Sequence, residues 1–162
     1  MNNTGKFKTK NEQLQSEKKW GKQVMSVGFN ILPSLLFKAQ KRLGLTSQQM
    51  MVLLHLSDHW WEAKNKPWPA VGKISDRMGI QRRQVQRIIT DLETAGLVIR
   101  IERTAKHRGK LSNAYDLSGL VKRLKEIAPE FIKADQEAKD IQKAVTKPKT
   151  FKAVKKKEND NE

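Results

Sequence analysis

The apolar positions lie mainly in the middle of the chain, and their spacing predicts a series of short helices. Residues 24–32 mix β-branched and aromatic side chains and predict a short strand or an extended lead-in. Residues 33–44 then place leucines and an alanine on one face of a helix that ends at a glycine. A second helix follows over residues 46–61, where Thr46 and Gln49 fit a capping box. Because its apolar side chains lie almost all round it, we expect this helix at the centre of the core.

Two further helices follow the proline-rich residues 65–69, which cannot continue a helix because each proline disfavours helical geometry in the residue before it. Residues 71–78 predict a short helix that ends at a glycine turn, and residues 81–95 predict a longer helix that is closed by Gly96. The buried face of the longer helix is expected to carry Val85, Ile88, Ile89 and Leu92. Its opposite face is then polar and rich in arginine and glutamine.

A β-hairpin is predicted after these helices. Residues 97–103 alternate apolar and polar side chains with the period of a half-buried strand, and residues 113–117 can pair back on them as the second strand. The inward side chains are expected to be Leu97, Ile99 and Ile101 on the first strand, and Tyr115 and Leu117 on the second. The connection between the strands, residues 104–112, is strongly basic.

A heptad seam follows the hairpin, because the apolar residues of 117–145 are spaced alternately three and four apart. Pro129 interrupts this seam and predicts two helices joined by a kink rather than one continuous helix. The seam could pack on the chain's own core, join two copies of the chain as a homodimer, or bind a second protein. The side chains that a homodimer would use are Leu120, Leu124, Ile127, Phe131 and Ile141.

The charge of the chain favours a polyanionic partner. The sequence holds 33 lysines and arginines against 17 aspartates and glutamates, which gives a formal net charge of +16. The predicted organisation is a flexible basic arm, a folded domain, C-terminal helices and a disordered basic tail, over residues 1–23, 24–117, 118–145 and 146–162. The excess is not confined to the two ends, since residues 73–110 alone carry 10 basic and 4 acidic side chains.

Several classes of protein are disfavoured by what the sequence lacks. There is no cysteine, which excludes a disulfide framework and a thiolate zinc site. No apolar run approaches the roughly 20 residues that span a bilayer, and the first 22 residues lack the apolar centre of a signal peptide. We therefore expect a soluble cytoplasmic protein, associated with the nucleoid, that has no membrane partner.

No catalytic or metal-binding constellation emerges from the remaining residues. His55 and His59 stand four apart on a predicted helix, but no glutamate follows His55 to complete a metalloprotease signature, so we interpret them as packing residues. Trp60, Trp61 and Trp68 could stack on bases, although aromatic residues at helical spacing are more often core. We expect no enzyme, no cofactor and no metal.

The order of a short helix, a glycine turn, an arginine-bearing helix and a basic hairpin resembles the winged helix-turn-helix family. The similarity is to bacterial regulators and to replication proteins of plasmids and phages, and Pro67–Leu120 carries it. Its most specific part contains Gly79, Val85, Arg87, Leu92, Glu93, Gly96 and Leu97. The resemblance implies a mainly α fold with a small β-hairpin wing, to which this chain adds C-terminal helices and basic flexible tails.

The resemblance also implies a function. Residues 81–95 would be the recognition helix in the major groove of double-stranded DNA, and residues 104–112 would be a wing on the backbone or in the minor groove. The residues that would contact DNA are Lys73, Gln81, Arg82, Arg83, Gln84, Gln86, Arg87, Thr90, Lys106, His107, Arg108 and Lys110. Ala70 and Gln81 depart from the family, because they stand where many members have a serine or threonine helix cap.

Three functions remain open at this point. The first, which the resemblance favours, is a sequence-specific transcriptional regulator that binds DNA as a dimer. The second is a replication-initiation or partition factor of a plasmid or phage that binds origin repeats. The third is a winged-helix adaptor that binds an acidic protein or RNA. The exposed arginines could also have no binding role and simply form a solvated helix face.

Overall fold

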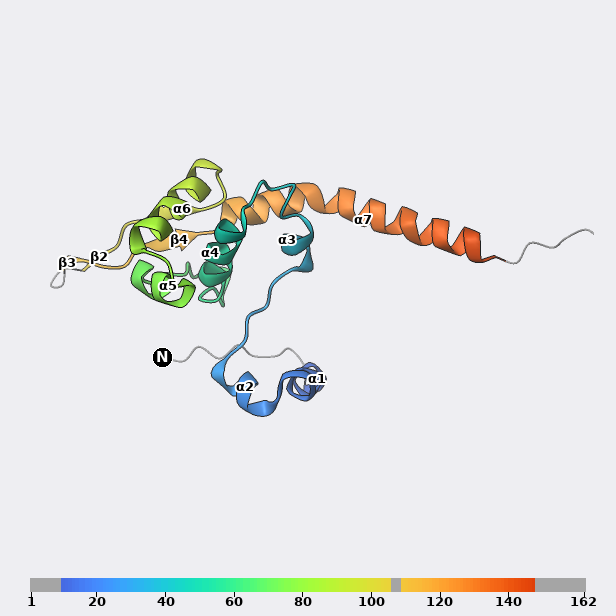
Figure 1. Ribbon diagram of the computed structural model, residues 1–162, viewed down its shortest axis with the longest axis horizontal. Helices are drawn as coiled ribbons and strands as arrows, with labels where there is room; N and C mark the ends of the chain where they lie inside the picture. The colour runs from blue at the N-terminus through green and yellow to red at the C-terminus, as the bar shows by residue number, and fades with distance from the viewer. Residues whose placement is uncertain (1–9, 106–108, 148–162) are drawn as a thin grey trace, which may run out of the picture. The chain divides into compact units, whose positions relative to one another are not determined.

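The computed structural model describes residues 10–105 and 109–147 (Figure 1). The chain divides into two units, one up to Glu126 and one from Ile127 onward. The described helices are α1 (Lys10–Trp20), α2 (Lys22–Val27), α3 (Ser34–Lys38), α4 (Ser47–Ser57), α5 (Val71–Met78), α6 (Arg82–Thr94) and α7 (Ser118–Thr146). The described strands are β1 (Ile99–Ile101), β2 (Thr104–Ala105), β3 (Gly109–Lys110) and β4 (Ala114–Asp116).

The core of the first unit lies where α4, α5 and α6 pack against one another and the β1–β4 pair lies beside them (Figure 1). α4 is at its centre as expected, since Val52, Leu53 and Leu56 are fully buried. The capping box is confirmed, because the Thr46 hydroxyl accepts from the Gln49 backbone N–H and the Gln49 side chain accepts from that of Thr46. The apolar face of α6 is also confirmed, with Val85, Ile88, Ile89 and Leu92 all buried.

The turns that separate these helices follow the glycines. Gly79 ends α5 in the left-handed conformation, with φ 65°, and Gly96 does the same after α6, with φ 70°. Residues with a Cβ rarely adopt this region, so glycine allows the chain to reverse at once. α5 and α6 therefore form the helix-turn-helix that the sequence predicts.

The hairpin after α6 consists of two short antiparallel ladders. β1 pairs with β4, with Arg100 opposite Tyr115, and β2 pairs with β3. Tyr115 and Leu117 are buried as predicted, but the prediction that Ile99 lies inward is wrong, because this side chain is 55% exposed. The side chain that β1 directs toward α6 is that of Arg100, which forms an ion pair with Glu93. Because successive side chains of a strand point to opposite faces, Ile99 lies on the other face.

The segments before α4 differ from expectation. Residues 24–32 form no strand, because α2 extends to Val27, and only residues 28–33 form an irregular lead-in to α3. α3 is shorter than predicted, since residues 39–44 form turns, and α4 ends at Ser57, before both tryptophans that the periodicity had placed on it. Residues 10–20 are helical although a flexible arm was expected, in keeping with the high helix propensity of lysine, glutamate and glutamine.

α7 is one continuous helix, so the prediction of two helices joined at Pro129 is wrong. Proline removes one backbone N–H donor and the hydrogen bond that it would make to the carbonyl four residues earlier. The residues on both sides of Pro129 are mostly alanine, lysine, glutamate and isoleucine, which sustain a helix across one missing bond. Leu120, Leu124 and Ile127 are buried, whereas Ile132, Ile141 and Val145 are 66–78% exposed.

Candidate nucleic-acid interface

The first two turns of α6 expose three arginines that form no ion pair with another described residue. Arg82, Arg83, Gln86 and Arg87 are exposed, while the opposite face of the same helix is buried in the core. No carboxylate of the described residues lies within ion-pair distance of these three arginines. A helix held by its apolar face thus presents arginine and glutamine, the side chains best suited to base edges and phosphates.

The N-termini of α5 and α6 have no side-chain caps. Ala70 and Gln81 occupy the N-cap positions with extended backbone geometry, and neither side chain bonds to the first turn. This agrees with the departure from the family that the sequence shows. The first-turn N–H groups of both helices are therefore left to other acceptors.

The structure gives Gln84 and Lys73 different surroundings. The Gln84 amide donates to the Gln48 side chain of α4 at 3.0 Å, so it contributes to the packing between these helices. Lys73 is exposed on α5, on the face that also carries Arg77, and borders a hollow beside the C-terminal end of α4. The assignment of both residues to DNA contact stays a prediction.

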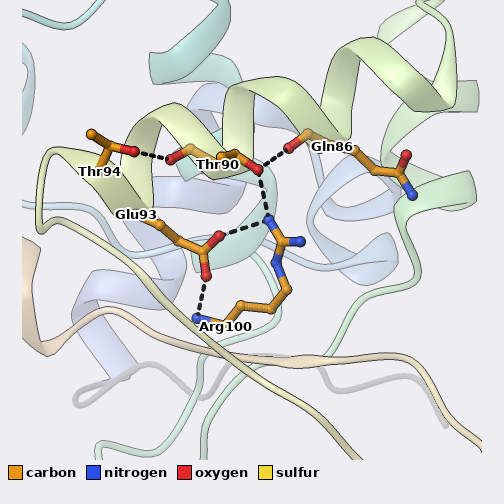
Figure 2. A network of polar contacts seen from close by, with 5 residues as sticks. All are labelled: Gln86, Thr90, Glu93, Thr94 and Arg100. Atoms are coloured by element: carbon orange, nitrogen blue, oxygen red, sulfur yellow. Dashed lines mark hydrogen bonds and ion pairs between the residues drawn. The ribbon is translucent and has the colours of Figure 1, made fainter.

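A polar network joins α6 to β1 and includes Thr90 (Figure 2). The Arg100 guanidinium donates to Glu93 Oε2 at 2.7 Å and to Thr90 Oγ1 at 3.1 Å, and the Arg100 backbone N–H donates to Glu93 Oε1 at 2.9 Å. The Thr90 hydroxyl donates in turn to the carbonyl of Gln86, whose side chain points away from the network. Thr90 is therefore already engaged within the protein, and its role is at least partly to hold β1 against α6.

The base of the wing is well described, but its tip is not. Lys110 is exposed and pairs with Glu102 at 3.1 Å across the hairpin, which neutralises part of its charge. Lys106, His107 and Arg108, which the sequence assigned to DNA contact, lie outside the described residues. Gly109 adopts φ 66° at the start of β3, a conformation that glycine reaches without strain.

At the base of the wing, Arg103 contacts Trp68 and Ser112, and the sequence did not predict these contacts. The Arg103 guanidinium lies over the Trp68 ring, 4.7 Å from its centroid, and Trp68 is 60% exposed. Arg103 also approaches the backbone carbonyl of Ser112 at 3.5 Å, on the returning side of the hairpin. The alternation of residues 97–103 marks Arg103 as the end of a strand, but nothing in that pattern indicates that it meets a tryptophan 35 positions earlier.

The loop that carries Trp68 is fixed to β4. The Tyr115 backbone N–H donates to the Pro67 carbonyl at 2.8 Å, and Lys66 pairs with Asp116 at 2.8 Å. The hydrogen bond from Lys66 and that from the Ser118 backbone hold the pKa of the Asp116 carboxyl below its ordinary value. Burial raises the pKa of the Tyr115 hydroxyl, because ionisation would place a charge in the core.

His55 lies on α4, His59 lies just after its C-terminal end, and the two residues contact each other. His59 Nδ1 lies 3.1 Å from the His55 carbonyl oxygen, and burial lowers the pKa of His55. Among the described residues, no group of three or more histidine, aspartate or glutamate side chains is arranged to hold a metal ion. None of the described helices is long and apolar enough to cross a membrane.

Comparison with known proteins places the chain in a family. The model of the DnaD N-terminal domain family matches residues 32–137. No curated protein sequence matches significantly.

Among solved structures, the N-terminal domain of DnaD from Geobacillus kaustophilus is similar, with 19% sequence identity, 81% of this chain and 98% of that chain covered, and a TM-score of 0.47. A MarR-family transcriptional regulator from a Rhodococcus species has 16% identity, 86% and 94% coverage, and a TM-score of 0.38. Both structural likenesses are low, so the assignment depends on the match to the family, which covers most of the chain. The chain belongs to the DnaD N-terminal domain family, a non-catalytic winged-helix domain of bacterial replication-initiation proteins.

Proposed function

We propose that this chain binds double-stranded DNA during the initiation of replication, with α6 in the major groove of origin repeats. The observation that carries this proposal is the uncompensated charge of α6, where Arg82, Arg83 and Arg87 are exposed without an acidic partner among the described residues. On a solvated face that served only solubility, we would expect acidic side chains among the arginines, whereas the exposed acid of α6, Asp91, follows all three of them. Membership of a replication-initiation family supplies the biological setting.

The mechanism divides the work between two kinds of contact. Arginines at positions 83 and 87 can each donate two hydrogen bonds to guanine, and Gln86 can pair in the same way with adenine. Lysines and arginines of the wing would neutralise phosphates and release counterions, which sets the affinity but not the sequence preference. The Arg100 network holds β1 against α6, so both kinds of contact would be made from one rigid body.

The test is duplex binding by single arginine variants. Arg83→Ala and Arg87→Ala should each weaken binding to a selected site by about 5- to 150-fold and relax the base preference there. Arg123→Ala is the matched control, since it removes the same charge from an exposed residue of α7 that pairs with Glu126. Equal losses for the α6 variants and the control would mean that only net charge matters and would refute the assignment of α6.

Selection of bound duplexes from a random pool separates the remaining functions. Enrichment of a repeated motif that also occurs at a replication origin would support the proposal. A site confined to promoters would instead favour the transcriptional regulator, to which no family match points. A salt titration tests the third possibility, because a DNA binder loses affinity with a slope near −0.9 per neutralised phosphate and a protein-binding adaptor shows no such dependence on duplex.

We further propose that α7 joins two copies of the chain. Leu120, Leu124 and Ile127 of the heptad seam are buried, so the residues left to a partner are those from Phe131 onward, including Ile141. Ile141→Lys should then shift sedimentation equilibrium from dimer to monomer, while Lys139→Ala, on an exposed position of the same helix, should not. An unchanged dimer would refute this role, and a monomeric wild type would leave the exposed seam to a different protein partner.

A further inference from the structure

Trp68 is unusually exposed for its residue type and position. It lies between two buried prolines, Pro67 and Pro69, in a loop that is hydrogen-bonded to β4, yet 60% of its surface is open. A tryptophan that served only to fill the core would bury its ring, as Tyr115 does one strand away. The loop therefore holds the indole outward on a fixed backbone.

One part of this indole is already covered by a cation. The Arg103 guanidinium lies 4.7 Å from the ring centroid, and it can cover only one of the two ring faces. Since 60% of the surface of Trp68 is open, the guanidinium leaves part of the indole accessible. An aromatic ring that is partly open to solvent is a surface on which a second planar group can stack.

Two hollows meet at Trp68. One, of about 460 Å³, is also lined by Trp61, Lys64 and Lys66. The other, of about 1340 Å³, is also lined by Lys73 and Arg77 of α5, and by Ser112 at the returning end of the wing. Either volume is large enough for an unpaired nucleotide, and Trp68 lies at the border of both.

The charges around the indole are suited to phosphate. Lys73 and Arg103 have no ion-pair partner among the described residues, whereas Arg77 pairs with Asp58 at 3.3 Å and Lys66 pairs with Asp116. Of these two cations without acidic partners, Arg103 lies over the exposed ring and Lys73 lines the same hollow as the ring. This is the combination that single-stranded nucleic acid uses, in which bases stack on aromatic rings and cations follow the backbone.

We propose that Trp68 is a stacking platform for an unpaired base of single-stranded DNA, with Lys73 and Arg103 holding the adjoining phosphates. This site is distinct from the exposed face of α6, which would contact paired DNA. The two sites would let one domain hold duplex and an adjacent unpaired strand together. The proposal does not depend on duplex binding, because the two are measured separately.

The experiment is the binding of the full chain to an oligothymidylate of about 12 nucleotides, measured by fluorescence anisotropy of a labelled strand. Trp68→Ala should weaken binding by about 5- to 150-fold, the loss of one stacked base, and leave duplex binding unchanged. Trp68→Phe retains an aromatic ring and should recover most of the affinity. Because Trp68 is exposed, neither variant should disturb folding, which thermal unfolding can verify.

Trp20→Ala is a matched control. Trp20 is 59% exposed and has a lysine over its ring, with Lys19 Nζ 5.1 Å from the centroid, but it lines neither hollow. Its removal should leave oligothymidylate binding within about twofold of wild type. Equal losses for the two tryptophans would mean that any exposed indole suffices and would overturn the proposed site, as would the absence of binding by the wild type.

A second variant tests the phosphate contact. Lys73→Gln should lower the salt dependence of oligothymidylate binding by about 0.7 in the log–log slope, the value for one neutralised phosphate on a single strand. An unchanged slope would remove Lys73 from the site. An equal loss of affinity for single strands and for duplex in Trp68→Ala would show that the residue supports the wing rather than a base, and would overturn the proposal.

Discussion

Glu93→Ala should be among the most destabilising single changes at the surface of this domain. Glu93 accepts two hydrogen bonds from the same residue, one from the Arg100 backbone N–H at 2.9 Å and one from its guanidinium at 2.7 Å. Removing the carboxylate leaves the backbone donor without its acceptor and leaves the guanidinium with Thr90 alone. The variant would therefore weaken the attachment of β1 to α6 without altering the apolar core.

The size of the effect follows from the burial of the pair. A hydrogen bond to a charged group contributes about 1.5–3 kcal/mol when it is well shielded from water. Glu93 and Arg100 side chains are both 29% exposed, so we discount each bond to about 1 kcal/mol, or about 2 kcal/mol for the two together. For a folded domain of roughly 100 residues this corresponds to a fall of about 8 °C in Tm.

Glu102→Ala is the matched control against which the stability loss of Glu93→Ala is compared. Glu102 pairs with Lys110 at a similar distance, 3.1 Å, but the two side chains are 73% and 69% exposed, so its loss should cost less than about 0.5 kcal/mol. The measurement is urea unfolding followed by circular dichroism, together with thermal unfolding of both variants. If Glu93→Ala cost no more than Glu102→Ala, the network would not hold β1 to α6 and the reasoning from burial would be wrong.

Three further predictions concern the same unit. Gly119→Ala should destabilise it by about 1–3 kcal/mol, because a Cβ there would collide with a backbone carbonyl after α6. A Cβ at Gly72, within α5, would make only an ordinary contact with the Arg82 side chain, so Gly72→Ala should stabilise the unit by about 0.5–1 kcal/mol. Thermal unfolding of the two variants tests both signs. Thr46→Ala should cost about 1 kcal/mol in urea unfolding through loss of the capping box, and Thr46→Ser should restore most of it. The hydrogen bonds from Lys66 and Ser118 lower the pKa of Asp116 in the folded state. The stability that Asp116 contributes is therefore present above its ordinary pKa of 3.8 and is lost as the pH falls through the lowered pKa. Asp116→Asn should reduce stability at neutral pH and flatten the decline in stability below about pH 4, and an unchanged pH profile would contradict the assignment.

The sequence predicted the helix-turn-helix well because local signals and packing agree there. The glycines that end α5 and α6 adopt the left-handed geometry that their positions imply, and the apolar period of α6 matches its buried face. The prediction failed where a polar contact between two successive elements, α6 and β1, decided the outcome. Ile99 was placed inward by alternation alone, but the ion pair between Arg100 and Glu93 gives the covered face of β1 to Arg100.

Pro129 shows a different limit of sequence reasoning. A proline removes one hydrogen bond, but whether the helix ends there depends on how well the residues on both sides sustain it. In α7 they do, and the helix continues to Thr146. Likewise the lysine- and glutamate-rich residues 10–20 lack an apolar stripe and suggested a flexible arm, although their helix propensity is high.

The candidate site was only partly predictable for a related reason. Exposed arginines on α6 follow from helical periodicity, because residues opposite a buried face must point to solvent. The pairing of Gln84 with Gln48, and of Arg103 with Trp68, joins residues about 35 positions apart. Such contacts depend on how loops and strands are packed, and no local pattern encodes them. Trp68 was considered only as one of three aromatic residues, and its exposure alone distinguishes it.

The Arg100 network has a consequence for how DNA sequence would be recognised. Because the guanidinium ties β1 to both Thr90 and Glu93, the distance between α6 and the hairpin is set before any DNA arrives (Figure 2). A duplex bound by both elements would have to adjust its groove width to that distance. Base pairs that deform easily would adjust at lower cost than stiff ones, so preference would arise at positions that no side chain touches.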